Sequence, residues 1–192
     1  MHTALFLDRD GTINEEVDYL SSVNQLRLID GSAEAIREAN QLGLKVFIIT
    51  NQSGIARGML TEHNLKEVHT KLLELLNDNN AHVDAIYYCP HHPDAIESQY
   101  RKDCDCRKPN IGMLTKAQNE FNIDLKKSFV IGDRAIDIQT GNNAGATSIL
   151  VLTGYGKEEQ RLLRQHDARA DYIAENLYDA VQYVKQQHLP VS

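Results

Sequence analysis

The stretch TALFLDRDGT, residues 3–12, joins an apolar strand to the first cluster of charged side chains in the protein. Its first five residues form a short, mostly apolar segment, which is typical of a strand buried on both faces of a parallel sheet. This strand runs directly into Asp8, Arg9 and Asp10. Gly11 then allows the backbone to turn sharply. A buried strand that ends in a charged loop predicts an open α/β sheet whose functional groups lie at the carboxyl ends of the strands.

The rest of the chain repeats this unit of a short apolar strand followed by an amphipathic helix. Further strands are expected at residues 45–50, 85–88, 128–131, 147–152 and 172–174. Helices are expected at 32–42, in a long segment capped by Thr61, and at 112–121, 136–144, 158–165 and 177–187. We expect Ser32 to cap the first helix, Gly43 to end it, and the chain to fray after Pro190. The pattern predicts a three-layer α/β/α fold with a mainly parallel, Rossmann-like sheet.

Composition and charge favour one globular domain that covers residues 1–192 and acts on a small substrate. Of the 192 residues, 42% are hydrophobic and 24% charged, which is enough for a single core. The net charge of -7 leaves no basic stripe, so nucleic-acid and membrane partners are not expected. Met1 opens directly onto the first strand without a signal-peptide pattern, so we expect a cytoplasmic protein. No exposed apolar stripe stands out, and a monomer is the default.

Polar side chains follow the first, second and fourth predicted strands, and a lysine precedes the fourth; these groups are expected to meet at the carboxyl ends of the strands. These residues are Asp8 and Asp10, Thr50, Lys108 and Asp133. Three carboxylates close together raise one another's pKa unless a cation compensates their charge. Oxygen ligands of this kind suit Mg²⁺, which also accepts a phosphate oxygen of a substrate.

This set of groups predicts phosphoryl transfer through a carboxylate nucleophile. Asp8 would attack the phosphorus, and Asp10 would protonate the leaving oxygen and then activate water. Thr50 and Lys108 would bind the phosphate. Each motif alone has a structural explanation, since Asp-Gly after a strand is commonly a turn. Asp137 is open between capping the next helix and supporting the ligand shell.

The order of these motifs resembles the haloacid dehalogenase superfamily of phosphatases over nearly the whole chain. The resemblance implies an HAD-like fold, Asp8 as nucleophile, Asp10 as acid and base, and Thr50 and Lys108 as phosphate ligands. It also implies Mg²⁺ held by the Asp8 side chain, the Asp10 carbonyl and Asp133. The interval between Gly11 and Thr50 is too short for a large cap domain, so we expect an open site.

All three cysteines fall in a segment, about residues 89–108, that has neither helical nor alternating periodicity. The candidate ligands of a closed Cys₃His zinc site in this segment are Cys89, His91, Cys104 and Cys106. Unligated thiols are the alternative, and His92 could replace His91. A zinc ion with four protein ligands cannot activate water, so its role would be to hold the loop in shape before Arg107 and Lys108.

This loop narrows the resemblance to the branch that contains histidinol-phosphate phosphatases and heptose-bisphosphate phosphatases. NQSGIARG at 51–58 and YCPHHP at 88–93 look like the heptose enzymes, whereas GDRAIDIQ at 132–139 is similar to the histidinol-phosphate enzymes. The branch implies substrate contacts from Glu16, Asp18, Tyr19, Thr50, Asn51, Gln52, Ser53 and Arg107. A second phosphate needs further positive charge, for which Arg57, Arg107 and Arg134 are candidates.

Together these features predict a Mg²⁺-dependent phosphatase with a structural zinc loop that acts on a small phosphorylated sugar through an aspartyl-phosphate. The resemblance implies hydrolysis of the C7 phosphate of a heptose 1,7-bisphosphate, on the route to nucleotide-activated heptose for surface polysaccharide. Histidinol phosphate is the alternative substrate. An interpretation from another class is a zinc-stapled phosphate-binding module without turnover, which would not require both Asp8 and Asp10.

Overall fold

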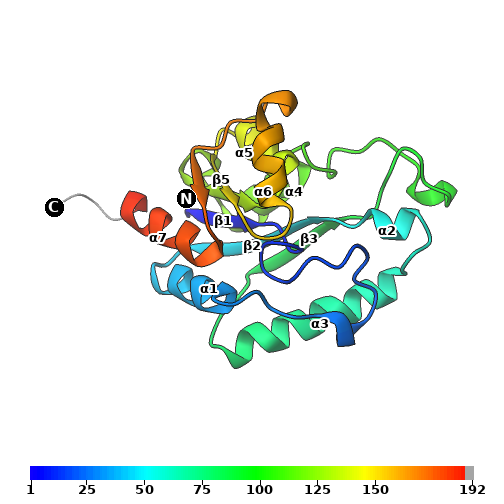
Figure 1. Cartoon of the computed structure of the whole chain (residues 1–192), viewed down its shortest axis with the longest axis horizontal. Helices are drawn as coiled ribbons and strands as arrows, with labels where there is room; N and C mark the ends of the chain where they lie inside the picture. Colours follow the sequence, from blue (N-terminus) through cyan, green and yellow to red (C-terminus); the bar gives the residue numbers. More distant parts are fainter. Residues whose placement is uncertain (189–192) are drawn as a thin grey trace.

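A computed structural model describes residues 1–188, in which six strands form one parallel sheet. The strand order is β3-β2-β1-β4-β5-β6, so β1 lies at the centre between β2 and β4 (Figure 1). The strands are β1 Ala4–Leu7, β2 Lys45–Asn51, β3 Ala85–Cys89, β4 Phe129–Gly132, β5 Thr147–Val151 and β6 Tyr172–Ala174. The carboxyl ends of β1, β2 and β4 therefore meet at one edge, as the strand-to-loop pattern predicts.

Helices cover both faces of the sheet and give the expected three layers. On one face lie α1 Ser32–Gln41, α3 Glu62–Asp78 and α7 Leu177–His188, and the opposite face carries α4 Gly112–Phe121 and α5 Ala135–Ala144 (Figure 1). The helix α6 Gly156–Leu162 packs beside α5. The remaining elements are the short helix α2 Ser53–Ala56 and four 3-10 turns, at Val23–Gln25, Ser98–Tyr100, Leu125–Lys127 and Leu163–His166.

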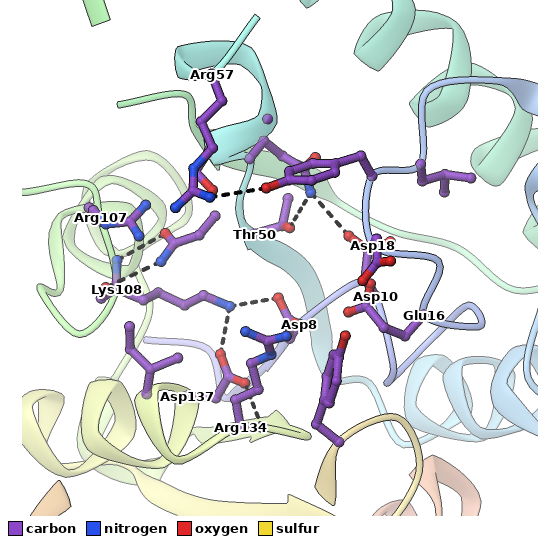
Figure 2. A pocket seen from close by; sticks show the side chains of 18 residues that line it. Asp8, Asp10, Glu16, Asp18, Thr50, Arg57, Arg107, Lys108, Arg134 and Asp137 are labelled. Atoms are coloured by element: carbon purple, nitrogen blue, oxygen red, sulfur yellow. Dashed lines mark hydrogen bonds and ion pairs between the residues drawn. The ribbon is translucent and has the colours of Figure 1, made fainter. Parts of the chain in front are cut away.

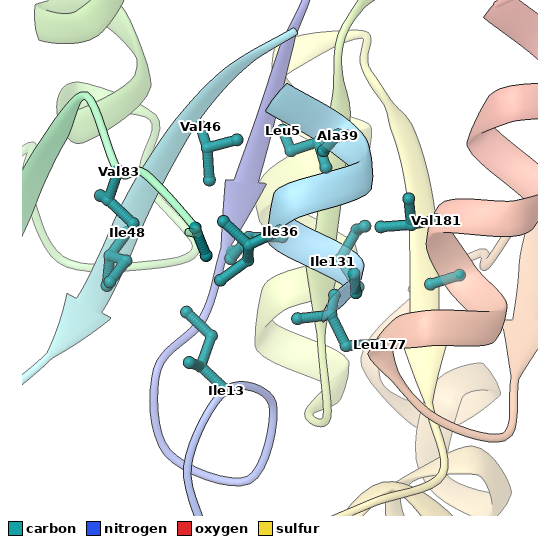
Figure 3. Packing of buried hydrophobic residues seen from close by; sticks show 14 of the residues in the cluster. Leu5, Ile13, Ile36, Ala39, Val46, Ile48, Val83, Ile131, Leu177 and Val181 are labelled. Atoms are coloured by element: carbon teal, nitrogen blue, oxygen red, sulfur yellow. The ribbon is translucent and has the colours of Figure 1, made fainter. Parts of the chain in front are cut away.

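Alternation along the central strand supplies both cores. Leu5 and Leu7 are fully buried and pack with Ile36 of α1 in the larger hydrophobic cluster (Figure 3). Phe6 faces the other way and stacks on Phe47 of β2 with ring centroids 5.3 Å apart. A strand with no polar position fits only the middle of a sheet that is covered on both faces.

Several local expectations are confirmed and others are wrong. Thr61 caps α3 through a capping box with Asn64, and Gly43 has the left-handed φ of +76° that ends α1. Ser32 does not cap α1, because Gly31 holds the cap position with φ of 81° and Ser32 is buried inside the first turn. The helix expected at residues 158–165 begins at Gly156 and changes to a 3-10 turn at Leu163–His166.

The segments that join β1 to α1 and β3 to α4 carry only short elements. Residues 12–31 form a loop with one 3-10 turn, and residues 90–111 form the cysteine loop with another. No large cap domain occurs in the described part of the chain, which agrees with the open site expected from the sequence. Within residues 1–188 no helix combines the length and apolar character that crossing a membrane requires. The fraying expected after Pro190 falls outside the described residues.

Two adjacent leucines of α3 test how much the larger core stabilises the fold. Leu72 is fully buried in that core, whereas Leu73 on the same helix is 40% exposed. Leu72→Ala should lower the free energy of unfolding by about 2–5 kcal/mol, because it leaves a cavity. Leu73→Ala has the same helix propensity change and should cost less than about 1 kcal/mol. Urea unfolding checks this, and equal losses would contradict the packing described.

Candidate active site

A pocket of about 360 Å³ opens at the carboxyl ends of the central strands (Figure 2). The pocket is lined by all the residues that the sequence predicts for catalysis or substrate contact: Asp8, Asp10, Glu16, Asp18, Tyr19, Thr50, Asn51, Gln52, Ser53, Arg57, Arg107, Lys108 and Arg134. Asp133, which the sequence predicts as a metal ligand only, is not among the lining residues. The lining residues come from the end of β2, from the start of α2 and from loops that are far apart in the chain. The topology of the sheet, rather than nearness in sequence, brings them together.

The Lys108 ammonium lies between two carboxylates at the floor of the pocket (Figure 2). Its Nζ donates to Asp8 Oδ1 and to Asp137 Oδ1, each at 2.6 Å. A third bond, of 3.0 Å, goes to the main-chain oxygen of Ile49. Burial alone would lower the pKa of Lys108, but the charges of Asp137 and Asp8 outweigh burial and raise it. Lys108 is therefore a permanent cation at this position.

Asp8 presents one free carboxylate oxygen to the pocket. Lys108 occupies Oδ1, and no hydrogen bond from the described residues reaches Oδ2. Burial raises the pKa of Asp8 to about 6 despite the attraction of Lys108, and Asp137 and Asp10 add to the rise. Asp8 is still largely ionised near neutral pH, as a nucleophile must be.

The main chain around Lys108 is held by one side chain from β2 and by one from its own loop. Asn51 at the end of β2 donates to the Lys108 carbonyl at 3.2 Å and accepts from the Lys108 amide at 3.1 Å. Arg107 donates to the carbonyl of His91 at 3.2 Å. Asn51 thus holds the loop that carries Lys108 as well as lining the pocket.

Asp10 is held by a different set of partners from Asp8. Arg9 donates to both of its carboxylate oxygens, at distances from 2.6 to 3.1 Å. Asn14 and Gln52 add bonds of 2.9 and 3.1 Å. Burial would raise the pKa of Asp10, but Arg9 and these hydrogen bonds lower it below its usual value.

The carboxylates that converge are those of Asp8, Asp133 and Asp137, whose oxygens lie within 4.8 Å of one another. The sequence predicted Asp10 in place of Asp137. Asp10 differs because its carboxylate is bound to Arg9, whereas Asp137 reaches back from α5 to Lys108 and also accepts the Arg134 amide at 3.1 Å. Asp137 therefore both caps α5 and supports the site.

Asp133 has the character of a cation ligand. It is fully buried, Oδ2 accepts the Tyr155 amide at 2.8 Å, and Oδ1 has no hydrogen-bond partner among the described residues. Burial raises its pKa to about 8, and Asp8 and Asp137 add to the rise. Asp133 Oδ1 is thus a buried oxygen without a partner, and the carboxylates of Asp8 and Asp137 next to it have only one ammonium, that of Lys108, to balance their charge. Carboxylate oxygens in this arrangement fit Mg²⁺.

The cysteine loop gathers four donor atoms of the kind zinc prefers. Cys89, Cys104 and Cys106 are free thiols with sulfur atoms 3.2–3.5 Å apart. His91 Nδ1 lies 3.4 Å from Cys106 Sγ and 3.7 Å from Cys89 Sγ. Tetrahedral zinc would set such atoms roughly 3.5–3.8 Å apart, so the cluster is compatible with zinc. His92 is outside it, because its Nδ1 accepts the Asp94 amide at 3.1 Å.

Cationic side chains surround the mouth of the pocket. Arg57 donates to the Tyr19 hydroxyl at 3.2 Å, and Arg134 lies over the Tyr155 ring, 4.2 Å from its centroid. Burial raises the pKa of Glu16 to about 7, and Asp10 adds to the rise while Arg134 opposes it. The rim thus combines guanidinium groups with an acid that titrates near neutral pH.

Sequence reasoning missed Arg9, Asn14, His69 and Tyr155 as site residues. Arg9 is fully buried and His69 nearly so. A charged residue between two acids at the end of a buried strand is a signal that could have pointed to Arg9. His69 lies on the buried face of α3 and Tyr155 in the loop after β5, and nothing in their local sequence marks them as site residues.

The chain resembles known hydrolases over nearly its whole length. A family model described as HAD-hydrolase-like matches residues 105–180. The D-glycero-beta-D-manno-heptose-1,7-bisphosphate 7-phosphatase of Yersinia pestis is 39% identical over 186 residues, which are 96% of each chain. The enzyme of the same name from Photorhabdus laumondii is 47% identical over 152 residues, 79% of this chain and 81% of the relative.

A solved structure resembles the fold closely. The crystal structure of the D,D-heptose 1,7-bisphosphate phosphatase from B. bronchiseptica, complexed with magnesium and phosphate, has a TM-score of 0.85 and 32% identity to this chain. The likeness covers 96% of this chain and 99% of that chain. Magnesium and phosphate are thus ligands of a protein with the same arrangement of elements.

Gly154 tests the close contact that supports Asp133. Its φ is +52°, and a Cβ there would overlap the Asp133 carboxylate and the Gly11 backbone. Gly145 also has a left-handed φ, +70°, but a Cβ there would meet nothing within 4 Å. Gly154→Ala should therefore reduce phosphate release from a phosphate monoester about 10- to 100-fold, whereas Gly145→Ala should affect only stability. Similar activity of the two variants in a steady-state assay would contradict the contact.

Proposed function

We propose that this chain, which belongs to the family of the D-glycero-beta-D-manno-heptose-1,7-bisphosphate 7-phosphatases, hydrolyses the C7 phosphate of that sugar. The family assignment rests on relatives that are 39% and 42% identical over 96% and 92% of this chain. It makes the protein a phosphoric monoester hydrolase of the HAD-like class, which removes support from the non-catalytic interpretation. The relatives named above do not favour histidinol phosphate as the substrate.

The observation that carries the mechanism is the pair formed by Asp8 and Lys108. The buried ammonium bonds to Asp8 Oδ1 and leaves Oδ2 without a hydrogen-bond partner among the described residues, and Asp8 lines the pocket. A phosphate in the pocket would meet this oxygen as the nucleophile, with Lys108 and the Thr50 hydroxyl next to its own oxygens. Thr50 is 2% exposed and already accepts a 2.8 Å bond from Gln52, so its hydroxyl proton is available for the phosphate.

The reaction then proceeds in two displacements. Asp8 Oδ2 forms a bond to phosphorus as the bond from phosphorus to the C7 oxygen breaks, and Asp10 gives its proton to that oxygen. The negative charge of bound phosphate opposes the effect of Arg9 and favours this proton on Asp10. Asp10 next takes a proton from water, whose oxygen bonds to phosphorus. The bond to Asp8 breaks, which releases phosphate and restores the carboxylate.

We further propose that Mg²⁺ binds to the side chains of Asp8 and Asp133 and to the Asp10 carbonyl. The unpartnered Asp133 Oδ1 supports this assignment. When bound, the ion supplies positive charge that offsets the repulsion between the carboxylates and the substrate phosphate. Asp137 already bonds to Lys108 and the Arg134 amide, and its role is to keep Lys108 in place.

The second phosphate of the sugar is proposed to bind at the cationic rim. Arg107, Arg134 and Arg57 line the pocket, and guanidinium groups suit two-point contact with phosphate. The Arg134 guanidinium stacks on the Tyr155 ring in a cation–π contact, which holds Arg134 in place. Glu16, Asp18, Tyr19 and Ser53 also line the pocket, where they are candidates to bind sugar hydroxyls.

Zinc is proposed to bind to Cys89, His91, Cys104 and Cys106 and to hold the loop that carries Arg107 and Lys108.

The net charge of -7 supports a protein without nucleic-acid or membrane partners, and we propose a cytoplasmic monomer. The heptose 1-phosphate product would serve the formation of nucleotide-activated heptose for surface polysaccharide.

Phosphate release with Mg²⁺ tests the substrate assignment. The kcat/KM for heptose 1,7-bisphosphate should exceed those for histidinol phosphate and fructose 1,6-bisphosphate by at least about 100-fold. Histidinol phosphate has no second phosphate for the rim, and the two phosphates of fructose 1,6-bisphosphate are joined by a carbon chain one atom shorter. Asp8→Asn, which keeps the size of the side chain, should abolish release from every substrate. A preference for histidinol phosphate, or full activity of Asp8→Asn, would contradict the proposal.

Two neighbouring histidines test the zinc assignment. Metal analysis of the purified protein should find about one zinc per chain. His91→Ala should lose this zinc and, because the loop before Lys108 is then released, most of the activity. His92→Ala changes the same residue type one position away, outside the cluster, and should keep both. Zinc retained in His91→Ala, or lost from His92→Ala, would show that the ligand set is wrong.

A further inference from the structure

Arg9 is a fully buried arginine, and most of its guanidinium hydrogen bonds go to Asp10. Its Nε donates to Asp10 Oδ1 at 3.1 Å, and its Nη2 donates to Oδ1 at 2.8 Å and Oδ2 at 2.6 Å. A planar guanidinium in this fork geometry fixes both the position and the plane of a carboxylate. Asp10 lines the pocket and Arg9 does not, so Arg9 holds the Asp10 carboxylate without contacting the pocket itself.

His69 of α3 fixes Arg9 in turn. Arg9 Nη1 lies 3.1 Å from His69 Nε2, and because arginine only donates hydrogen bonds, Nε2 is the acceptor. His69 is 8% exposed, and its ring packs edge-on against Tyr88 with centroids 6.0 Å apart. Burial, together with Arg9, lowers the pKa of His69 to about 3, so the imidazole is neutral and keeps this acceptor.

We infer that Arg9 and His69 are positioning residues that set the orientation of the Asp10 carboxylate for its proton transfer to the leaving oxygen. This inference rests on the acid and base role of Asp10 proposed above. Without the guanidinium, Asp10 would keep only the neutral amides of Asn14 and Gln52, each of which reaches a single oxygen. One bond to each oxygen leaves the carboxylate free to tilt.

His69 is the sharper of the two residues to test, because it touches neither Asp10 nor the pocket. Its acceptor atom completes the hydrogen bonding of a buried cation, and an Arg9 N–H without an acceptor would draw the guanidinium towards other partners. A change at His69 therefore reaches the reaction only through Arg9. The effect should be specific to the step in which Asp10 gives up its proton.

Leaving-group dependence separates this role from a structural one. Protonation matters for a sugar alkoxide but little for p-nitrophenolate, which is stable as an anion. Since kcat/KM reports the steps up to the first displacement, His69→Phe should lower it about tenfold or more for heptose 1,7-bisphosphate. For p-nitrophenyl phosphate the change should stay within about twofold. His69→Gln, whose amide oxygen can accept from Arg9, should recover most of the loss.

Two further variants keep the outcome decisive. Arg9→Lys keeps the charge beside Asp10 but cannot bridge to His69, so it should give the same pattern as His69→Phe. It replaces His69→Phe as the test if circular dichroism shows that His69→Phe folds poorly. Asp10→Asn should show the largest leaving-group dependence. Equal losses on both substrates, or no loss in His69→Phe and Arg9→Lys, would overturn the inference. The proposed function would still stand if Asp10→Asn showed the expected leaving-group dependence. Asp10→Asn without leaving-group dependence would instead contradict the proposed role of Asp10, and the inference with it.

Discussion

The pairing of one buried ammonium with two buried carboxylates organises this protein. Lys108 Nζ bonds to Asp8 and Asp137 at 2.6 Å each, in a place where an uncompensated charge would be strongly destabilising. Each partner arrives on a different element: Asp8 after the central strand, Asp137 on α5, and Lys108 at the end of the cysteine loop. The sheet order and the anchoring of Lys108 by Asn51 bring these three groups to one point.

The two sides of the pocket prepare carboxylates for different chemistry. On one side, burial and like charges raise the pKa values of Asp8 and Asp133, which creates a demand for positive charge that a cation and Lys108 can meet. On the other side, Arg9 and the hydrogen bonds from Asn14 and Gln52 lower the pKa of Asp10. Carboxylates whose environments differ in this way can act separately as nucleophile and as proton carrier. The Arg9 and His69 contacts extend this separation from charge to orientation.

The sequence was sufficient for the parallel fold and for the set of residues around the pocket, because both follow from strands that end in polar loops. It could not separate Asp10 from Asp137, since which carboxylate reaches Lys108 depends on how α5 sits against the sheet. Ser32 was predicted as a helix cap, but Gly31 adopts the left-handed turn that the preceding loop imposes. Arg9, His69 and Tyr155 were missed because their roles arise from contacts between elements.

The most direct measurement is to trap the covalent intermediate. The Asp10→Asn variant should be mixed with Mg²⁺ and p-nitrophenyl phosphate, a substrate that needs little protonation of its leaving group, and quenched in acid within the first turnover. Peptide mass spectrometry should then find one phosphoryl group, carried by Asp8. A phosphoryl group on another residue, or turnover at the full rate with no labelled protein at any time, would contradict the account in which Asp8, held by Lys108, is the nucleophile.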